Sequence, residues 1–337
     1  MKRSVLIIGV ALLAADLTHA ADCPATKYFP NPSDIDTHVF QLEAGYTPIA
    51  VGQLAAVTPK CSTADTKGYG ATIKAAFMKA PDGLKTELCN LKCIAVFDGD
   101  GSWGKWANTN SKYKGDDSAV IGVGTNDLNI SLKSKLDQNL LGIAGDQHIV
   151  NNDTMEVSLM YTLAHEMAHI KWRRDFTNGN INGNCPMDTF ITTSWKGHAG
   201  SKTRRWTYFG DEFGDYKKNI KTPSQVGSDT DVNAIYNGGF ATALGATNPE
   251  EDFVESYAIG AIIAANQQYK LNISTILKLA GGSLIYVDDP NFRANSGDLL
   301  KFKISQCVFP LLQAAVTGDG DYGKKRDDGR KRSKRRR

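Results

Sequence analysis

The sequence predicts an α+β fold in which short strands come first and long helices follow. Strand-like apolar runs bounded by turn residues lie before Asp153, and a long amphipathic stretch with helix-start signals begins there. A second stretch with strong helix-start signals begins at Asn248. This order, with short strand candidates before Asp153 and helices after it, fits the α+β class.

The first 20 residues have the pattern of an export signal. Met1–Arg3 is basic, Val5–Ala15 is apolar, and the small residues Thr18 and Ala20 precede a cleavage point after Ala20. The apolar run is well short of the roughly 20 residues that a membrane span requires, and no later run is long and apolar enough. We therefore expect a secreted protein (extracellular, or periplasmic in a Gram-negative cell) with no membrane span.

All six cysteines lie after this signal. An even number of cysteines in an exported chain favours three disulfides, with the pairing left open. Cys89 and Cys93 are four positions apart, which a metal site could also use, but no second pair has this spacing. Disulfides are therefore the favoured interpretation.

Candidate strands lie within residues 21–150. Leu91–Phe97 and Ala119–Val123 are short apolar runs of the kind that form buried strands. The run Asp98–Gly101 (DGDG) is expected to be a turn, because it lacks the ligand ladder and closing glutamate of an EF-hand calcium loop.

The stretch from Asp153 is the clearest helix in the sequence. Asp153 as N-cap and Glu156 three residues later have the spacing of a capping box. Apolar residues then recur every three or four positions and predict one core-facing stripe. The stripe consists of Met155, Leu159, Leu163, Met167 and Ile170.

This helix carries the run His165-Glu166-Met167-Ala168-His169. Histidines four positions apart project from the same face, so their imidazoles can converge on one zinc ion. Glu166 can reach the water that the metal binds and act as general base in peptide hydrolysis. The motif predicts two zinc ligands and a catalytic base, and the alternative is a pair of surface histidines on an amphipathic helix.

A hydrolytic zinc ion needs a third protein ligand and an open position. Asp175 lies ten residues after His165, where the metzincin motif places its third ligand. However, Trp172 stands where that motif has the glycine that turns the chain. Asp175 is therefore the less favoured candidate.

The second predicted helix supplies the favoured candidate. Asn248 as N-cap, Pro249 at the first position and acids in the first turn start a helix that continues to about Gln267. Glu251 is the expected third ligand, and Glu255 one turn later could hold the other ring nitrogen of a histidine. The alternative for Glu251 is a capping role at Asn248.

The rest of the chain is predicted in less detail. Residues 185–247 are rich in glycine, threonine and aromatic residues, and we expect mostly loop with short helical turns. A further helix is expected near Ile273–Leu279. From Lys324 to Arg337 there are ten Lys/Arg residues and two Asp residues, so this end carries a net charge of +8 and the remainder about −5. Residues 317–337 are expected to be a disordered basic tail, which could bind anionic surfaces nonspecifically.

The run Asn248–Ala258 (NPEEDFVESYA) resembles the NPxEDFAExFA run of secreted zinc-dependent metallopeptidases, which are zincin metallopeptidases of gluzincin type. It is also similar to the Glu-x-x-x-Glu ligand helix of the anthrax lethal factor catalytic domain. The resemblance covers mainly residues 150–265. It implies that Glu251 binds Zn²⁺, with Glu255 as its neighbour.

The same resemblance implies a zincin-like fold: a small mixed sheet packed on the HExxH helix, with a cleft between the sheet and the second ligand helix. Residues 21–150 would form the upper part of the catalytic domain, and residues 151–316 its zinc-binding part.

One position departs from the family. The resemblance implies a tyrosine seven residues before the ligand glutamate, where its hydroxyl would stabilise the oxyanion, but Leu244 stands there. Tyr236, Tyr257 and His198 are alternative donors by sequence. The sequence therefore predicts a secreted zinc metalloendopeptidase acting on proteins or peptides. The alternatives are a catalytically impaired zincin-like protein that binds zinc or a partner, and a secreted binding protein whose histidines are incidental.

Overall fold

The structure is a computed structural model of the whole chain. It describes residues 22–41, 61, 63–106, 119–139, 147–174, 180–196, 207–208, 238–242, 244–278, 284–286 and 297–313. The predicted signal (residues 1–20), the basic tail (residues 317–337), Asp175, His198 and Tyr236 lie outside the described residues.

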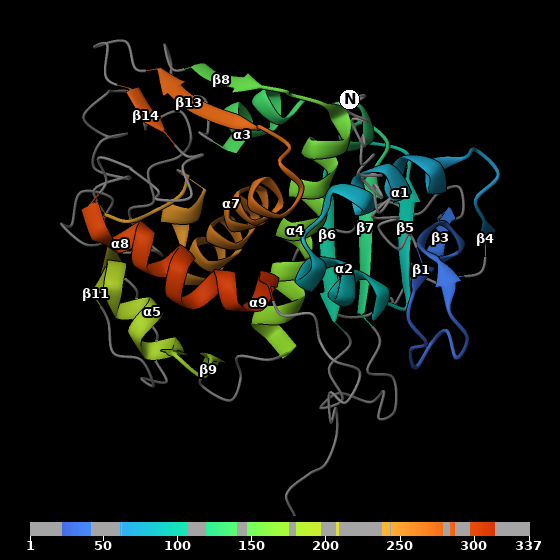
Figure 1. Cartoon of the computed structure of the whole chain (residues 1–337), viewed down its shortest axis with the longest axis horizontal. Helices are drawn as coiled ribbons and strands as arrows, with labels where there is room; N and C mark the ends of the chain where they lie inside the picture. Colours follow the sequence, from blue (N-terminus) through green and yellow to red (C-terminus); the bar gives the residue numbers. More distant parts are fainter. Residues whose placement is uncertain are drawn as a thin grey trace, which may run out of the picture.

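The described residues form an α+β structure, as the sequence predicts (Figure 1). The strands are β1 (Asp22–Cys23), β2 (Ser33–Asp34), β3 (Val39–Gln41), β4 (Thr63–Ala64), β5 (Cys93–Phe97), β6 (Ser102–Trp106), β7 (Ala119–Gly124), β8 (Gln147–Asn151), β9 (Asn180–Asn182), β10 (Cys185–Pro186), β11 (Trp195–Lys196), β12 (Thr207–Tyr208), β13 (Ser274–Lys278) and β14 (Leu284–Tyr286). The α-helices are α1 (Tyr69–Lys79), α2 (Asp82–Cys89), α3 (Leu132–Asn139), α4 (Met155–Arg174), α5 (Met187–Ser194), α7 (Pro249–Tyr269), α8 (Gly297–Phe302) and α9 (Phe309–Gln313). Shorter 3₁₀ turns are η1 (Ile35–His38), η2 (Asp127–Asn129) and η5 (Gly245–Thr247), and η6 (Lys303–Val308) is a π-helix.

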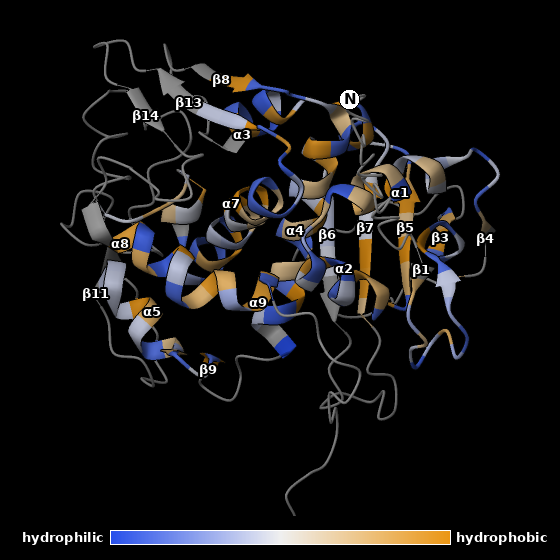
Figure 2. Ribbon diagram, viewed as in Figure 1, coloured by the Kyte–Doolittle hydropathy of each residue, from blue (hydrophilic) through white to orange (hydrophobic). Residues whose placement is uncertain are grey.

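A small mixed sheet with the strand order β4-β3-β5-β7-β6 organises the first half of the structure. The pairs β3–β5 and β5–β7 are parallel, whereas β6 runs antiparallel to β7 at the edge of the sheet. The central strands are apolar along their length (Figure 2) and fully buried. Ile94 and Val96 join the main core, and Ala95 and Phe97 pack in a second cluster on the other face, as the alternation of a strand requires.

The motif helix α4 lies between this sheet and α7 (Figure 1). It packs against β6, β7 and α1 on one side and makes its most extensive contacts with α7. Four residues of the predicted stripe are fully buried, namely Leu159, Leu163, Met167 and Ile170. The prediction is wrong for Met155, which is 53% exposed because it occupies the first position of the helix.

The N-cap of α4 differs from the prediction. Thr154 caps the helix, since its hydroxyl accepts a hydrogen bond from the backbone N–H of Val157. Asp153 instead accepts hydrogen bonds from the backbone N–H groups of Leu132 and Lys133, at the start of α3. The predicted cap residue therefore holds a neighbouring helix start, a contact that a local motif cannot reveal.

The start of α7 is as predicted. Asn248 is the N-cap, its side chain accepts a hydrogen bond from the backbone N–H of Glu251, and Pro249 occupies the first position. The helix ends at Tyr269, where Lys270 adopts a left-handed conformation. Nearly every residue from Asp252 to Ala265 is buried, because α4, η5, η6 and α9 pack around this helix.

The predicted helix near Ile273–Leu279 is wrong. Residues Ser274–Lys278 form strand β13, which pairs antiparallel with both β8 and β14. The β-branched residues Thr275 and Ile276 favour an extended chain, and partners on both sides supply the ladder hydrogen bonds. Upstream, α5 is an eight-residue helix within the region expected to be mostly loop.

All six cysteines are paired, as Cys23–Cys89, Cys61–Cys93 and Cys185–Cys307. The prediction of three disulfides is confirmed. The alternative metal pair is excluded because Cys89 and Cys93 are bonded to different partners. Of the helices described, none is both long and apolar enough to span a bilayer.

Candidate metal centre

Both motif histidines of helix α4 are partly exposed within an otherwise buried segment. The rings of His165 and His169 lie one helical turn apart, with centroids separated by 5.0 Å. Their side chains are 14% and 13% exposed, whereas Met167 and Ile170 beside them are fully buried. A small part of each imidazole therefore remains exposed to solvent.

The carboxylate of Glu251 faces both histidines. Its Oε2 lies 3.9 Å from Nε2 of His165, and its Oε1 lies 3.6 Å from Nε2 of His169. One ligand atom from each of the three residues lies within 4.8 Å of the others. The capping interaction at Asn248 uses only the backbone N–H of Glu251, so it leaves the carboxylate for the histidines.

These three donors fit a zinc ion. Zinc bonds to nitrogen and oxygen measure about 2.0–2.2 Å, so two donors of a tetrahedral site lie about 3.4 Å apart. The separations of 3.6 and 3.9 Å are close to that value. In addition, Oε2 of Glu251 is buried and has no hydrogen-bond partner among the described residues. A buried carboxylate oxygen without a partner is costly unless a cation accompanies it.

Comparisons with known proteins provide no counterpart for this site. No family model, curated protein or solved structure matches the chain. Inferences about its function therefore depend on the geometry of its own residues.

Glu255 holds the far side of His165. Its Oε1 lies 2.6 Å from Nδ1 of His165, while its Oε2 accepts hydrogen bonds from the hydroxyls of Tyr161 at 2.8 Å and Thr242 at 2.6 Å. Burial acts to raise the pKa of Glu255, but these hydrogen bonds outweigh burial and lower it below its usual range. The ionised carboxylate can only accept, so Nδ1 of His165 carries the proton and Nε2 points to Glu251.

Glu250 makes the equivalent contact with the second histidine. Its Oε1 lies 2.8 Å from Nδ1 of His169. The side chain of Glu250 is 27% exposed, whereas that of Glu255 is fully buried. Each histidine thus has a carboxylate behind it that orients its ring, an arrangement found at most histidine-ligated metal sites.

The carboxylates of the cluster act on the pKa of His165. Burial alone would lower the pKa of His165, but the hydrogen bond with Glu255 and the charges of Glu166, Glu255 and Glu251 raise it to about 9. Burial raises the pKa of Glu251, against the opposing charges of His169 and His165. In the metal-free protein the cluster therefore retains a proton on His165, which a bound cation would displace.

Glu166 lies beside this cluster and is fixed from the edge strand. Its Oε1 is 4.0 Å from Nε2 of His165 and accepts a hydrogen bond of 2.7 Å from the hydroxyl of Ser102, the first residue of β6. Strand and helix approach closely at Gly104, where an added Cβ would lie 2.1 Å from the backbone oxygen of Glu166. Only glycine allows this approach, so β6 and the backbone of Glu166 are held in direct contact.

A buried ion pair anchors the first turn of α7. Nζ of Lys303 lies 2.6 Å from Oδ2 of Asp252, and both side chains are fully buried. Lys303 also donates to the carbonyl of Gly239, and Nε1 of Trp195 donates to Asp252. Because Asp252 follows Glu251 directly, this pair fixes the helix turn from which the Glu251 carboxylate projects.

Of the remaining candidates from the sequence, the structure describes Tyr257 and Leu244. Asp175, His198 and Tyr236 are outside the described residues. Tyr257 is fully buried, with its ring against Phe253, so it is a poor donor to a substrate in an open site. Leu244 is partly buried directly before η5 and adds no donor from its side chain.

Sequence reasoning did not identify Glu250, Ser102, Tyr161 or Thr242. Glu250 could have been found, because it directly precedes Glu251 in the first helical turn and is also acidic. The Ser102–Glu166 and Tyr161–Glu255 contacts join residues 64 and 94 positions apart, and no local pattern predicts them.

Proposed function

We propose that this chain is a secreted zinc-dependent endopeptidase. The observation that carries the proposal is the convergence of His165, His169 and Glu251 within 4.8 Å, with the carboxylate of Glu166 next to them. Three protein ligands and an open fourth position characterise hydrolytic zinc sites, whereas structural sites are closed by four. The mixed sheet, the motif helix and the ligand helix are consistent with a zincin-like arrangement, which is part of the proposal.

The edge strand supports a peptide as substrate. Within the described residues, β6 is the edge strand of the five-stranded sheet and pairs with β7. An extended peptide can add to such an edge as a further strand. The hydrogen bond between Ser102 and Glu166 places the start of this edge beside the candidate base. A peptide on β6 would thus pass close to Glu166.

Each residue of the site has a distinct role in the proposed reaction. His165, His169 and Glu251 would hold the metal ion, and a bound zinc ion supplies Lewis acidity that makes water a better nucleophile and polarises the scissile carbonyl. Glu166 takes a proton from the attacking water and passes it to the leaving amine. Ser102 orients the Glu166 carboxylate through the hydrogen bond to Oε1.

Export is the remaining part of the proposal. The three disulfides are compatible with an oxidising compartment, because such bonds are rare in the cytosol. The signal-like residues 1–20 agree with export. A peptidase in this location would act on protein substrates outside the cytoplasm.

Two measurements on purified protein test the proposal. Wild-type protein should contain about one tightly bound zinc per chain and should cleave casein until a chelator is added. Glu166→Gln should retain its zinc and lose turnover by about 10²–10⁴-fold, since the carboxylate transfers protons and does not bind metal. Glu251→Ala should lose both zinc and activity. Turnover of Glu166→Gln equal to wild type would disprove the general-base role.

A zincin-like protein that binds zinc without cleaving is the second candidate. The observation in its favour is Leu244, which supplies no oxyanion donor where the peptidases that Asn248–Ala258 resembles are expected to have tyrosine. Removing one such donor typically costs about 10²–10³ in turnover. Stoichiometric zinc in a protein that cleaves neither casein nor a peptide library would support this candidate over the first.

A further inference from the structure

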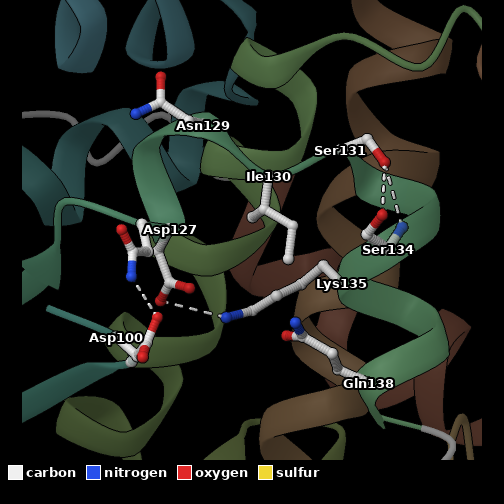
Figure 3. A pocket seen from close by; sticks show the side chains of 10 residues that line it. Asp100, Asp127, Asn129, Ile130, Ser131, Ser134, Lys135 and Gln138 are labelled. Atoms are coloured by element: carbon white, nitrogen blue, oxygen red, sulfur yellow. Dashed lines mark hydrogen bonds and ion pairs between the residues drawn. The ribbon is translucent and has the colours of Figure 1, made fainter.

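A polar pocket lies beside the start of the edge strand. It has a volume of about 570 Å³ and is formed by the turn between β5 and β6, the segment around η2, and one face of α3 (Figure 3). Its lining side chains include Asp100, Asp127, Ser131, Ser134, Lys135 and Gln138. With Ile130 the main apolar side chain in the wall, the pocket suits a polar or charged group.

Hydrogen bonds hold the two sides of this pocket together. The backbone N–H of Gly124 donates to the carbonyl of Gly101, and that of Asn126 donates to the carbonyl of Gly99. The side-chain amide of Asn126 donates to Oδ1 of Asp100. Because the β5–β6 turn and the segment after β7 are bonded in this way, the pocket is preformed.

The charges that line the pocket leave one negative group available. Lys135 lies 3.2 Å from Asp127, and these two side chains are only 14% and 8% exposed, so they neutralise each other within the wall. Figure 3 shows Asp100 across the pocket from Gln138. Asp100 is exposed, and its hydrogen bond from Asn126 comes from a neutral amide. The pocket therefore favours a cationic group that can reach Asp100.

The pocket is connected to the candidate active site along the chain. Gly101 lines the pocket, and the next residue, Ser102, donates its hydroxyl to Glu166. Two elements that line the pocket, η2 and α3, contact α4, the helix that carries Glu166. Strand β6, which begins directly after Gly101, also contacts α4. A peptide bound along the edge of β6 would therefore lie next to the segment that lines the pocket.

We propose that this pocket is a substrate subsite that accepts the side chain of lysine or arginine, with Asp100 as its counter-charge. The proposal rests on the proposed peptidase function and names the substrate class: peptides with a basic residue near the scissile bond. A long basic side chain has an apolar stem that can pass Ile130 and a cationic end that can reach the carboxylate.

Cleavage of a peptide series tests the subsite. The peptides differ at one position only, which holds arginine, lysine, norleucine or glutamate, and this position is moved in turn along the residues around the scissile bond. At one of these positions, kcat/KM should be higher for arginine and lysine than for norleucine and glutamate. Because Asp100 is exposed, we expect a preference of about three- to tenfold over norleucine. Asp100→Asn should abolish the preference without changing cleavage of the norleucine peptide, and Asp100→Lys should shift it towards glutamate.

Asp98→Asn is the matched control. Asp98 belongs to the same turn and is also exposed, but it lies 3.6 Å from Lys67 and does not line the pocket. The Asp98→Asn variant should keep the preference for arginine and lysine unchanged. Equal loss of preference in Asp98→Asn and Asp100→Asn would show that the general negative potential, and not the pocket, selects basic residues.

A binding measurement separates failure of the subsite from failure of the peptidase proposal. Glu166→Gln protein loaded with zinc should bind the arginine peptide more tightly than the norleucine peptide, and Asp100→Asn in this background should remove the difference. If wild-type protein cleaves peptides but neither cleavage nor binding depends on Asp100, the subsite is wrong and the peptidase proposal stands. If wild-type protein cleaves nothing, the binding comparison still decides for or against the pocket.

Discussion

The two carboxylates behind the histidines should contribute unequally to metal binding. Glu255 is fully buried and joins three partners: His165, Tyr161 and Thr242. Glu250 is partly exposed and contacts Nδ1 of His169 at 2.8 Å. A charge-assisted hydrogen bond contributes more where water is excluded. Replacement of Glu255 should therefore weaken zinc binding more than the same replacement of Glu250.

The expected magnitudes follow from these contacts. Loss of a carboxylate that orients a metal-binding histidine typically lowers metal affinity by about 10–100-fold. We expect Glu255→Gln to fall in the upper part of this range and Glu250→Gln in the lower part. Glu255→Ala should also destabilise the metal-free protein by about 2–4 kcal/mol, because it leaves a cavity and removes the acceptor shared by buried Tyr161 and Thr242.

Two assays separate these effects. Zinc affinity is measured by competition with a chromophoric chelator at fixed pH, and stability by thermal unfolding in excess chelator, so that metal binding does not contribute to stability. Glu250→Gln serves as the matched control, since it removes the same charge from the same helix. If Glu250→Gln weakens zinc binding as much as Glu255→Gln does, burial of the carboxylate does not set its contribution to zinc affinity, and the reasoning is wrong.

Three further predictions concern the surroundings of the site. Gly104→Ala should reduce turnover at least tenfold and lower the melting temperature, because a Cβ at this position would lie 2.1 Å from the backbone oxygen of Glu166 in the motif helix. Full activity of this variant would show that β6 shifts freely. Leu244→Tyr should raise turnover several-fold if a hydroxyl there reaches the oxyanion; unchanged turnover would indicate another donor. Burial would raise the pKa of Glu87, but the positive charges of Lys171 and Arg174 hold this pKa at about 2. The ionised carboxylate of Glu87 therefore stabilises the fold fully above about pH 4.5, and its contribution falls progressively as the pH drops towards 2. Glu87→Gln should therefore be less stable than wild type by roughly 2–4 kcal/mol at pH 7, with the difference shrinking between pH 4.5 and 2 in chelator-treated samples.

Local sequence patterns were sufficient for the elements that carry the candidate ligands. The motif helix and the ligand helix were predicted from periodicity and start signals, and the structure contains both as α4 and α7. The cap at Asn248 and strands β5 and β7 were also predicted. These features depend on residues within a few positions of one another, so they can be recognised in the sequence alone.

Contacts between distant parts of the chain decided the features that local sequence patterns did not predict. Asp153 caps α3 and not α4, and residues Ser274–Lys278 form a strand because β8 and β14 lie on either side. The carboxylate of Glu251 could have capped its own helix, and only the packing of α7 against α4 turns it towards the histidines.

The sequence by itself determined the types of donor available: two histidines one turn apart, an intervening glutamate and an acidic helix start. The tertiary structure decided which carboxylate faces Nε2 of each histidine and which lies behind it. It also brought Ser102 to Glu166 across 64 positions. The physical reason is that side-chain chemistry is a local property, whereas the approach of donors to within a few ångströms depends on how helices and strands from separate segments pack.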